Sequence, residues 1–111
     1  MHTSLSQSEF YILLSLAIKE RHGYEIMKQV EQDSRGRVLL GPGTLYGAIK
    51  RMLQSHLIEE ISGDNPRRRY YRLTEHGRKA LSAELERYQD ALALARRTGL
   101  FQPLGLLEST V

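Results

Sequence analysis

The first long apolar segment of the chain predicts a helix over residues 7–20. Ser6 and Glu9 have the spacing of a capping box, and Leu5 and Phe10 flank them as a hydrophobic staple. The segment is apolar on nearly every side, at Tyr11, Ile12, Leu13, Leu14, Leu16, Ala17 and Ile18. More than one face is therefore expected to be buried, one against its own domain and another against a partner chain.

A second helix is predicted over residues 24–33, where Tyr24, Met27 and Val30 recur at helical spacing. Gly23 suits the left-handed position past the end of the first helix. Residues 37–40 are short and apolar, and they are predicted to form a brief strand.

A third helix is predicted to begin at Pro42, whose missing N–H costs nothing in the first turn of a helix. The side chains expected to be buried on this helix are Leu45, Ile49, Met52 and Leu53. Three such helices, with the third entered through a tight turn, predict a helix-turn-helix.

A β-hairpin is predicted next, from a strand at 57–61, turn residues at 62–66 and a returning strand at 67–73. Alternation places Arg69, Tyr71 and Leu73 on one side and Arg68, Tyr70 and Arg72 on the other. Tyr71 and Leu73 are expected to face the core. The predicted fold is therefore mainly α with a small β-hairpin, a winged helix-turn-helix.

Thr74 is expected to cap a long last helix over residues 75–97. Its apolar positions follow heptad steps of four and three, at Leu81, Leu85, Tyr88, Leu92 and Ala95. Together with Phe10 and Leu14, they form the predicted interface of a homodimer. The alternative is a helix that lies on its own domain. We therefore expect a DNA-binding domain at 1–74 and a dimerisation helix with an apolar tail at 75–111, the tail packing on either protomer.

Positive charge is concentrated in the middle of the chain. Residues 35–79 carry ten Lys and Arg against four Asp and Glu, a net charge of +6, whereas residues 1–34 carry −2 and residues 80–111 carry −1. A localised basic surface attracts polyanions, among which nucleic acid is the commonest. The alternative is a solvated face that keeps the protein soluble.

In a winged helix the third helix enters the major groove of double-stranded DNA, and a helix N-terminus also attracts phosphate. Alternatives are that Tyr46 is a packing residue and that the arginines form a solvated strand edge that prevents aggregation. The candidate DNA-binding residues are Tyr24, Gly43, Thr44, Tyr46, Gly47, Lys50, Arg51, Arg67, Arg68 and Arg69.

Several other classes of protein are not indicated. The chain has no cysteine, its four histidines have no metal-binding spacing, and no hydrolase or nucleotide-binding fingerprint occurs. We therefore expect that the protein is not an enzyme and binds no metal or cofactor. No signal peptide or membrane-spanning run is apparent, so a cytoplasmic protein is expected.

Three motifs resemble the PadR-type transcriptional regulators of bacteria. They are His22-Gly23-Tyr24-Glu25-Ile26, the run from Gly43 to Met52 (GTLYGAIKRM) and the run from Arg69 to Gly77 (RYYRLTEHG). The resemblance covers about residues 8–80 and implies a homodimeric winged-helix repressor joined through its first and last helices. Family members often respond to phenolic acids or hydrophobic drugs, which implies a possible small-molecule effector.

The chain departs from that family in two respects: it has no tryptophan, which some drug-sensing relatives place in the dimer pore, and its C-terminal region is short. Tyr11, Tyr88 and Phe101 either line an effector pocket or serve as interface packing. Two rival functions remain open. One is a protein-interaction module, which would tend to lose the basic wing and third helix. The other is a ligand sensor whose DNA affinity is secondary.

Overall fold

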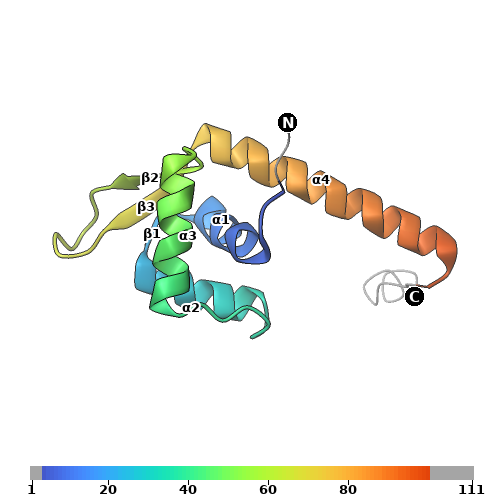
Figure 1. Ribbon diagram of the computed structural model, residues 1–111, viewed down its shortest axis with the longest axis horizontal. Coiled ribbons are helices and arrows are strands. Elements are labelled where there is room, and N and C mark those ends of the chain that lie inside the picture. Colours follow the sequence, from blue (N-terminus) through green and yellow to red (C-terminus); the bar gives the residue numbers. More distant parts are fainter. Residues whose placement is uncertain (1–3, 101–111) are drawn as a thin grey trace.

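The structure, a computed structural model, describes residues 4–100. Three helices and a small sheet form a body from which a long helix extends (Figure 1). In chain order the elements are α1 (Gln7–Ile18), β1 (Arg21–His22), α2 (Gly23–Asp33), α3 (Pro42–Gln54), β2 (Ile58–Ile61), β3 (Tyr70–Leu73) and α4 (Glu75–Thr98).

The capping box predicted for α1 is confirmed. The Ser6 hydroxyl accepts the Glu9 N–H at 3.1 Å, and the Glu9 carboxylate accepts the Ser6 N–H at 2.9 Å. The helix ends at Ile18, two residues earlier than predicted, because Lys19 is extended and leads the chain into β1. A second capping box, which the sequence analysis missed, starts α2: the His22 ring accepts the Glu25 N–H, and Glu25 accepts the His22 N–H.

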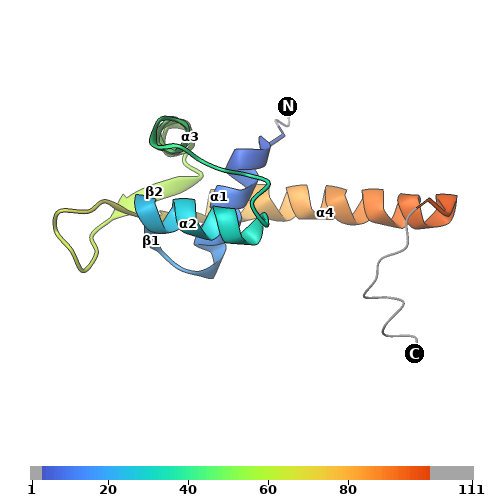
Figure 2. The same cartoon turned by 90° about the horizontal axis from the view of Figure 1, so that it is seen from below.

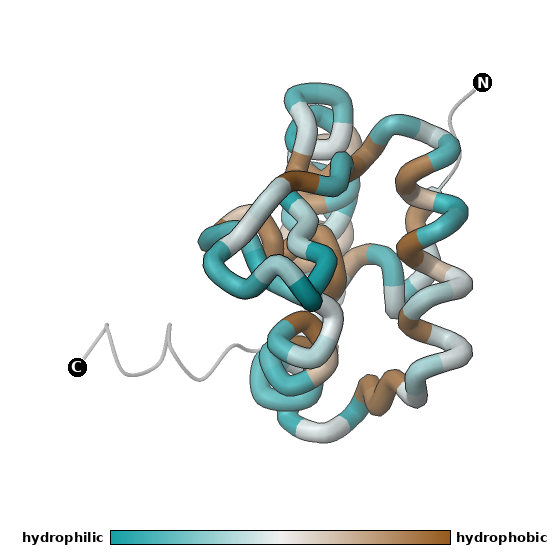
Figure 3. Tube along the Cα trace, turned by 90° about the vertical axis from the view of Figure 1, so that its left-hand side faces the viewer, coloured by the Kyte–Doolittle hydropathy of each residue, from teal (hydrophilic) through white to brown (hydrophobic). Residues whose placement is uncertain are grey.

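The core lies where α1, α2 and α3 meet the sheet and the first turns of α4. Apolar segments of the tube in Figure 3 gather between these elements. The buried positions predicted on α3 are confirmed, with Leu53 only partly covered, and so is the burial of Tyr71 and Leu73. Each fully buried Leu, Ile or Met stabilises the fold by about 1.5–3 kcal/mol. Six such side chains, all less than 2% exposed, are Ile12, Leu13, Ile26, Leu45, Met52 and Ile58.

The sheet has three strands rather than the two predicted, in the order β1-β3-β2, and both pairings are antiparallel. The added strand joins the start of α2 to the hairpin through the pairs Arg21↔Tyr71 and His22↔Tyr70. The predicted strand at 37–40 is wrong: within residues 4–100, this segment pairs with no strand. The Val38 N–H is bonded to the Ser34 hydroxyl instead, at 2.9 Å.

The returning strand β3 is shorter than predicted, since it covers Tyr70–Leu73 and leaves Arg67, Arg68 and Arg69 in the loop. Asn65 explains the difference, because its side chain accepts the Arg67 N–H and its carbonyl accepts the Arg68 N–H. This turn keeps the backbone out of strand geometry. The predicted alternation of Arg68 and Arg69, and their interpretation as a strand edge, are therefore wrong.

Thr74 caps α4 as predicted, by accepting the Gly77 N–H at 2.9 Å. The same hydroxyl lies 2.6 Å from the His56 carbonyl, and the Thr74 N–H donates to the Leu57 carbonyl at 3.1 Å. These hydrogen bonds fix the start of α4 to the segment between α3 and β2. The first turns of α4 pack on the body, and the helix then continues straight past it (Figure 2). Its full length is 24 residues, roughly 36 Å.

Within residues 4–100 no helix combines the length and apolar character needed to cross a bilayer. The apolar tail predicted to pack on a protomer, from Phe101 onward, lies outside the described residues.

Candidate nucleic-acid interface

The first turn of α3 is built without a side-chain cap. Gly41 occupies the N-cap position and Pro42 the first helical position, and within residues 4–100 this helix start has no side-chain cap hydrogen bond. Gly43 and Thr44 follow and are exposed. Free N–H groups, partial positive charge and bare glycines together suit the approach of a phosphate.

Tyr46 extends from α3 to the first turn of α2. It is 50% exposed, and its hydroxyl lies so close to Gly23 that a Cβ there would overlap it. The same Cβ would lie 3.0 Å from Cζ of Tyr46. Glycine at position 23 is therefore what allows Tyr46 to lie against α2. Tyr46 is both a partly packed residue and an accessible one, so the two sequence interpretations do not exclude each other.

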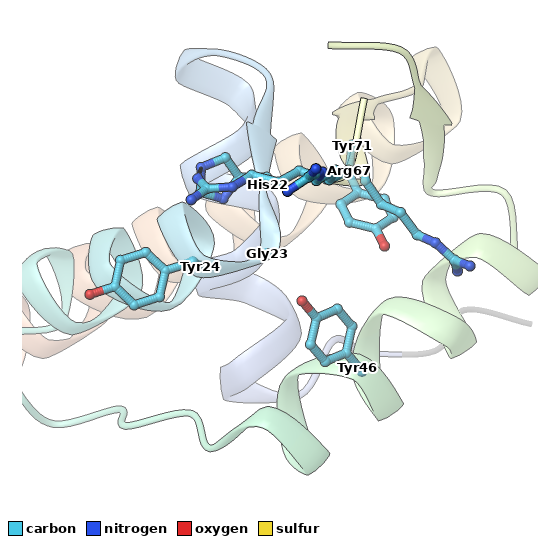
Figure 4. Close-up of a pocket in the computed structure, with 8 residues that line it drawn as sticks. His22, Gly23, Tyr24, Tyr46, Arg67 and Tyr71 are labelled. Atoms are coloured by element: carbon cyan, nitrogen blue, oxygen red, sulfur yellow. Dashed lines mark hydrogen bonds between the residues drawn. The ribbon is translucent and has the colours of Figure 1, made fainter. Parts of the chain in front are cut away.

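A cleft of about 590 Å³ separates α2, α3 and the wing, which is the hairpin loop of residues 62–69. Figure 4 shows the hydroxyls of Tyr46 and Tyr71 directed into this space from α3 and β3. The cleft collects five of the predicted DNA-binding residues in one place. Its lining residues are His22, Gly23, Tyr24, Tyr46, Arg67, Arg68, Arg69 and Tyr71.

The predicted cations have different surroundings. Arg67 and Arg69 are exposed on the wing, and Arg68 contacts Nε2 of His22. Lys50 is exposed on α3, one turn beyond Tyr46. Arg51 instead turns toward α1, where its Nε lies 3.7 Å from the Glu9 carboxylate and its guanidinium lies beside Gly47.

Arg72 is held away from this surface by two acids. Its Nε donates to Glu59 at 2.6 Å, and its Nη1 lies 3.9 Å from Glu20. The hydrogen bond to Glu59 raises the pKa of the Arg72 guanidinium above its ordinary value, with the charge of Glu59 adding to the effect. The basic residues of the hairpin therefore divide into wing arginines facing the cleft and one arginine paired on the sheet.

Sequence reasoning missed three residues of the cleft. The predicted left-handed position of Gly23 past the end of the first helix is wrong, because α1 ends at Ile18 and Gly23 is the first residue of α2, without a positive φ. The spacing from His22 to Glu25 is that of a capping box and could have located this helix start. Tyr71 was assigned to the core alone. Its sequence position gives no sign that its hydroxyl reaches a cleft.

A second surface follows α4. Leu85, Tyr88 and Leu92 remain 40–43% exposed and line a shallow groove of about 480 Å³. Other members of the predicted dimer interface are covered by the chain itself: Phe10 and Leu81 are buried and Leu14 is partly buried.

The exposed and the buried members of the predicted dimer interface are in contact. The ring of Tyr88 packs edge-on against that of Phe10, with centroids 5.0 Å apart. Ala95 is half-buried farther along α4. Glu84 is buried beside the stripe and bonds to Arg87 and to the Tyr88 hydroxyl. Among the described residues no cluster of three His, Cys, Asp or Glu side chains could hold a metal ion.

Known proteins resemble this chain in sequence and in fold. A 37.1 kDa protein of unknown character in transposon Tn4556 of Streptomyces fradiae is 35% identical over 94 residues, which are 85% of this chain. The chain spans only about 25% of that relative's length.

Solved structures agree with this likeness. A PadR family transcription regulator from Clostridium difficile R20291 is 29% identical, with a TM-score of 0.71 over 84% of this chain and 98% of that one. A transcriptional regulator from Clostridium thermocellum is 27% identical, with a TM-score of 0.67 over 80% and 89% of the two chains. These similarities confirm the predicted fold.

The model of the transcriptional regulator PadR-like family matches residues 12–83, which include α2, α3 and the hairpin. Proteins of this family are transcription regulators rather than enzymes. The match covers well over half of the chain, and the chain therefore belongs to the PadR-like family of transcriptional regulators.

Proposed function

We propose that this regulator is a sequence-specific repressor that binds a pseudo-palindromic DNA operator as a homodimer. The observation that carries the proposal is the convergence of Tyr46 and three exposed wing arginines on one cleft beside an uncapped helix start. Phosphate contacts of this kind fix the position of a protein on DNA, and base contacts from α3 would supply the sequence specificity.

The arrangement suggests how the protein would sit on a duplex. The exposed residues of α3 would enter the major groove, with Gly43, Thr44 and Tyr46 near its floor and edge and Lys50 one turn farther along. The partly buried Gly47 would leave room beside Tyr46. The wing arginines would reach the neighbouring backbone or a narrow minor groove. Arg51 would first have to leave Glu9, so we expect it to contribute less than Lys50.

The dimer in this proposal forms through α4. The stripe of Leu85, Tyr88 and Leu92 has the heptad spacing of a helix seam, and these side chains stay 40–43% exposed among the described residues. Residues 1–74 would then contact DNA, while residues 75–111 would hold two copies together. A two-fold dimer would present two copies of α3 to half-sites about one helical turn, ~34 Å, apart.

We also propose that a small hydrophobic or phenolic effector controls release from DNA. The groove on α4 supports this idea, since its lining joins apolar Leu85 and Leu92 to the Tyr88 hydroxyl and the Gln89 amide. Tyr11 packs edge-on against Phe10 beside it, at 5.4 Å, and Phe101 lies outside the described residues. Binding of such a molecule between two copies of α4 would change how the recognition helices are spaced.

The test is a salt titration of binding to the DNA just upstream of the protein's own gene, against a scrambled duplex of equal length. A specific regulator binds the native duplex more tightly, with affinity that falls steeply as salt rises. Equal weak binding to both duplexes would overturn the proposal for this site and favour a protein-interaction module or a distant operator.

Arg67→Ala and Lys50→Ala are each expected to weaken binding to every sequence and to reduce the salt slope by about one ion. Both cations are exposed near the proposed DNA path and would release one condensed counterion each. The measurement is the slope of the logarithm of the binding constant against the logarithm of salt concentration.

The matched control is Arg72→Ala, because that guanidinium is already paired with Glu59 and Glu20. Its salt slope should stay at the wild-type value. A slope that drops for Arg72→Ala but not for Arg67→Ala would show that the wing does not contact phosphate.

A further inference from the structure

Tyr71 is more than a core residue. It is only 2% exposed, and its ring belongs to the hydrophobic core, yet it also lines the cleft between α2, α3 and the wing. Figure 4 shows its hydroxyl directed into that cleft, toward Tyr46. A buried tyrosine ring thus presents its polar end to the surface where DNA is proposed to bind.

The Tyr71 hydroxyl has no hydrogen-bond partner within the part of the chain that the structure describes. Among the described residues no buried side-chain oxygen or nitrogen lacks a partner, so this hydroxyl is open to the cleft although its ring is buried. Within residues 4–100 no protein group bonds to this hydroxyl. A hydroxyl that opens on a cleft without a protein partner can donate to an acceptor oxygen of a ligand bound there.

The Tyr71 hydroxyl is available as a donor at neutral pH. Burial raises its pKa above the ordinary value of 10.0, and the negative charge of Glu60 and the neighbouring Tyr46 act in the same direction. The group therefore stays protonated under physiological conditions. It can donate a hydrogen bond, whereas a phenolate could only accept one.

The rest of the cleft also consists of donors. Arg67 and Arg69 add positive charge, and no Asp or Glu side chain is among the described residues that line the cleft. Nδ1 of His22 accepts the Glu25 N–H at 3.3 Å, so a neutral ring carries its proton on Nε2, which faces Arg68 and also lies 3.3 Å from the Glu25 carboxylate. Arg68 is then a donor opposed to a donor, and an anion would be its better partner.

We propose that this cleft binds one phosphate group, to which the hydroxyls of Tyr71 and Tyr46 donate and which the wing arginines hold by charge. The proposal rests on the proposed DNA-binding function and assigns a phosphate position within it. A phosphodiester of the DNA backbone and free phosphate share the required chemistry. The cleft volume of about 590 Å³ exceeds that of one phosphate and leaves room for the attached sugars.

Tyr71→Phe tests the proposal by removing a single hydroxyl. The unfolding midpoint should hardly change, because that hydroxyl has no partner within residues 4–100. Affinity for the operator duplex should fall by about tenfold, the loss expected for one hydrogen bond to a charged group. Tyr46→Phe, at a half-exposed position that does not put folding at risk, should give a similar loss.

The matched control is Tyr70→Phe on the same strand. Tyr70 packs edge-on against His22 at 5.4 Å and does not line the cleft, so its affinity for DNA should match the wild type. A second arm compares sodium phosphate with sodium chloride at equal ionic strength. Phosphate should raise the unfolding midpoint of the wild type more than that of Tyr71→Phe, if free phosphate also occupies the cleft.

The two arms separate the sources of phosphate and the two proposals. Loss of DNA affinity without phosphate-dependent stabilisation assigns the site to the DNA backbone alone, and both effects together add free phosphate. If Tyr71→Phe and Tyr46→Phe bind DNA as the wild type does, the phosphate site is overturned while DNA binding stands. If the wild type binds no DNA specifically, the proposed function fails. If, in that case, phosphate also stabilises the wild type and Tyr71→Phe equally, the phosphate site is overturned as well.

Discussion

Gly77→Ala is expected to lower the free energy of unfolding by about 3 kcal/mol, through overpacking at the start of α4. A Cβ at this position would overlap the carbonyl oxygen of Leu57 and lie 2.9 Å from Cδ1 of Leu73. The carbonyl cannot simply move away, because it also accepts hydrogen bonds from Thr74. Urea denaturation, followed by helical circular dichroism, would measure the change.

Gly47→Ala is the matched control for this substitution. Gly47 also lies inside a helix, but a Cβ there would meet only the Arg51 guanidinium, at an ordinary 3.7 Å. Alanine favours helix over glycine by up to about 1 kcal/mol, so this variant should be more stable than the wild type. A Gly77→Ala protein as stable as the Gly47→Ala protein would mean that α4 is not packed against Leu57.

Leu92→Glu is expected to convert the proposed dimer to a monomer and to weaken operator binding by about 10²-fold or more. Leu92 is 40% exposed in the single chain, and a carboxylate in an apolar helix seam would be buried without a partner. A monomer also loses the gain from binding two half-sites together, which commonly reaches 10²–10⁴. Sedimentation equilibrium gives the mass, and a duplex titration gives the affinity.

Leu94→Glu is the control, since it makes the same chemical change two residues away. Leu94 is 60% exposed and lies outside the heptad positions of the stripe. That variant should remain a dimer with wild-type affinity for DNA. Dissociation of Leu94→Glu, or a dimeric Leu92→Glu, would place the seam on another face of α4.

The elements that depend on local signals were predictable from the sequence. Capping residues, helical periodicity and a proline at the first helical position located α1, α3 and α4 to within two residues at the ends that were predicted. These signals act within a few residues of each other, and the burial of Leu45, Ile49 and Met52 follows from the same periodicity.

Long-range pairing explains what the sequence analysis missed. The two residues of β1 become a strand only because β3 runs beside them, a contact across 50 positions of the chain. Residues 37–40 have strand-like composition, but among residues 4–100 no strand pairs with them. The Tyr71 hydroxyl likewise reaches the cleft only because α2, α3 and the wing surround it in space.

Because α4 projects straight from the body, its length and pairing would determine the distance between the two DNA-binding bodies of the proposed dimer. Its first turn is fixed to the body through Thr74, so the body cannot slide along the helix. Two copies paired in opposite directions along the stripe would have bodies whose separation depends only on the register of the pairing. A register change of seven residues keeps the same stripe in contact and moves the bodies by about 10 Å. That distance is about three base-pair steps, so in the proposed dimer the heptad register would set which operator spacing the protein can match.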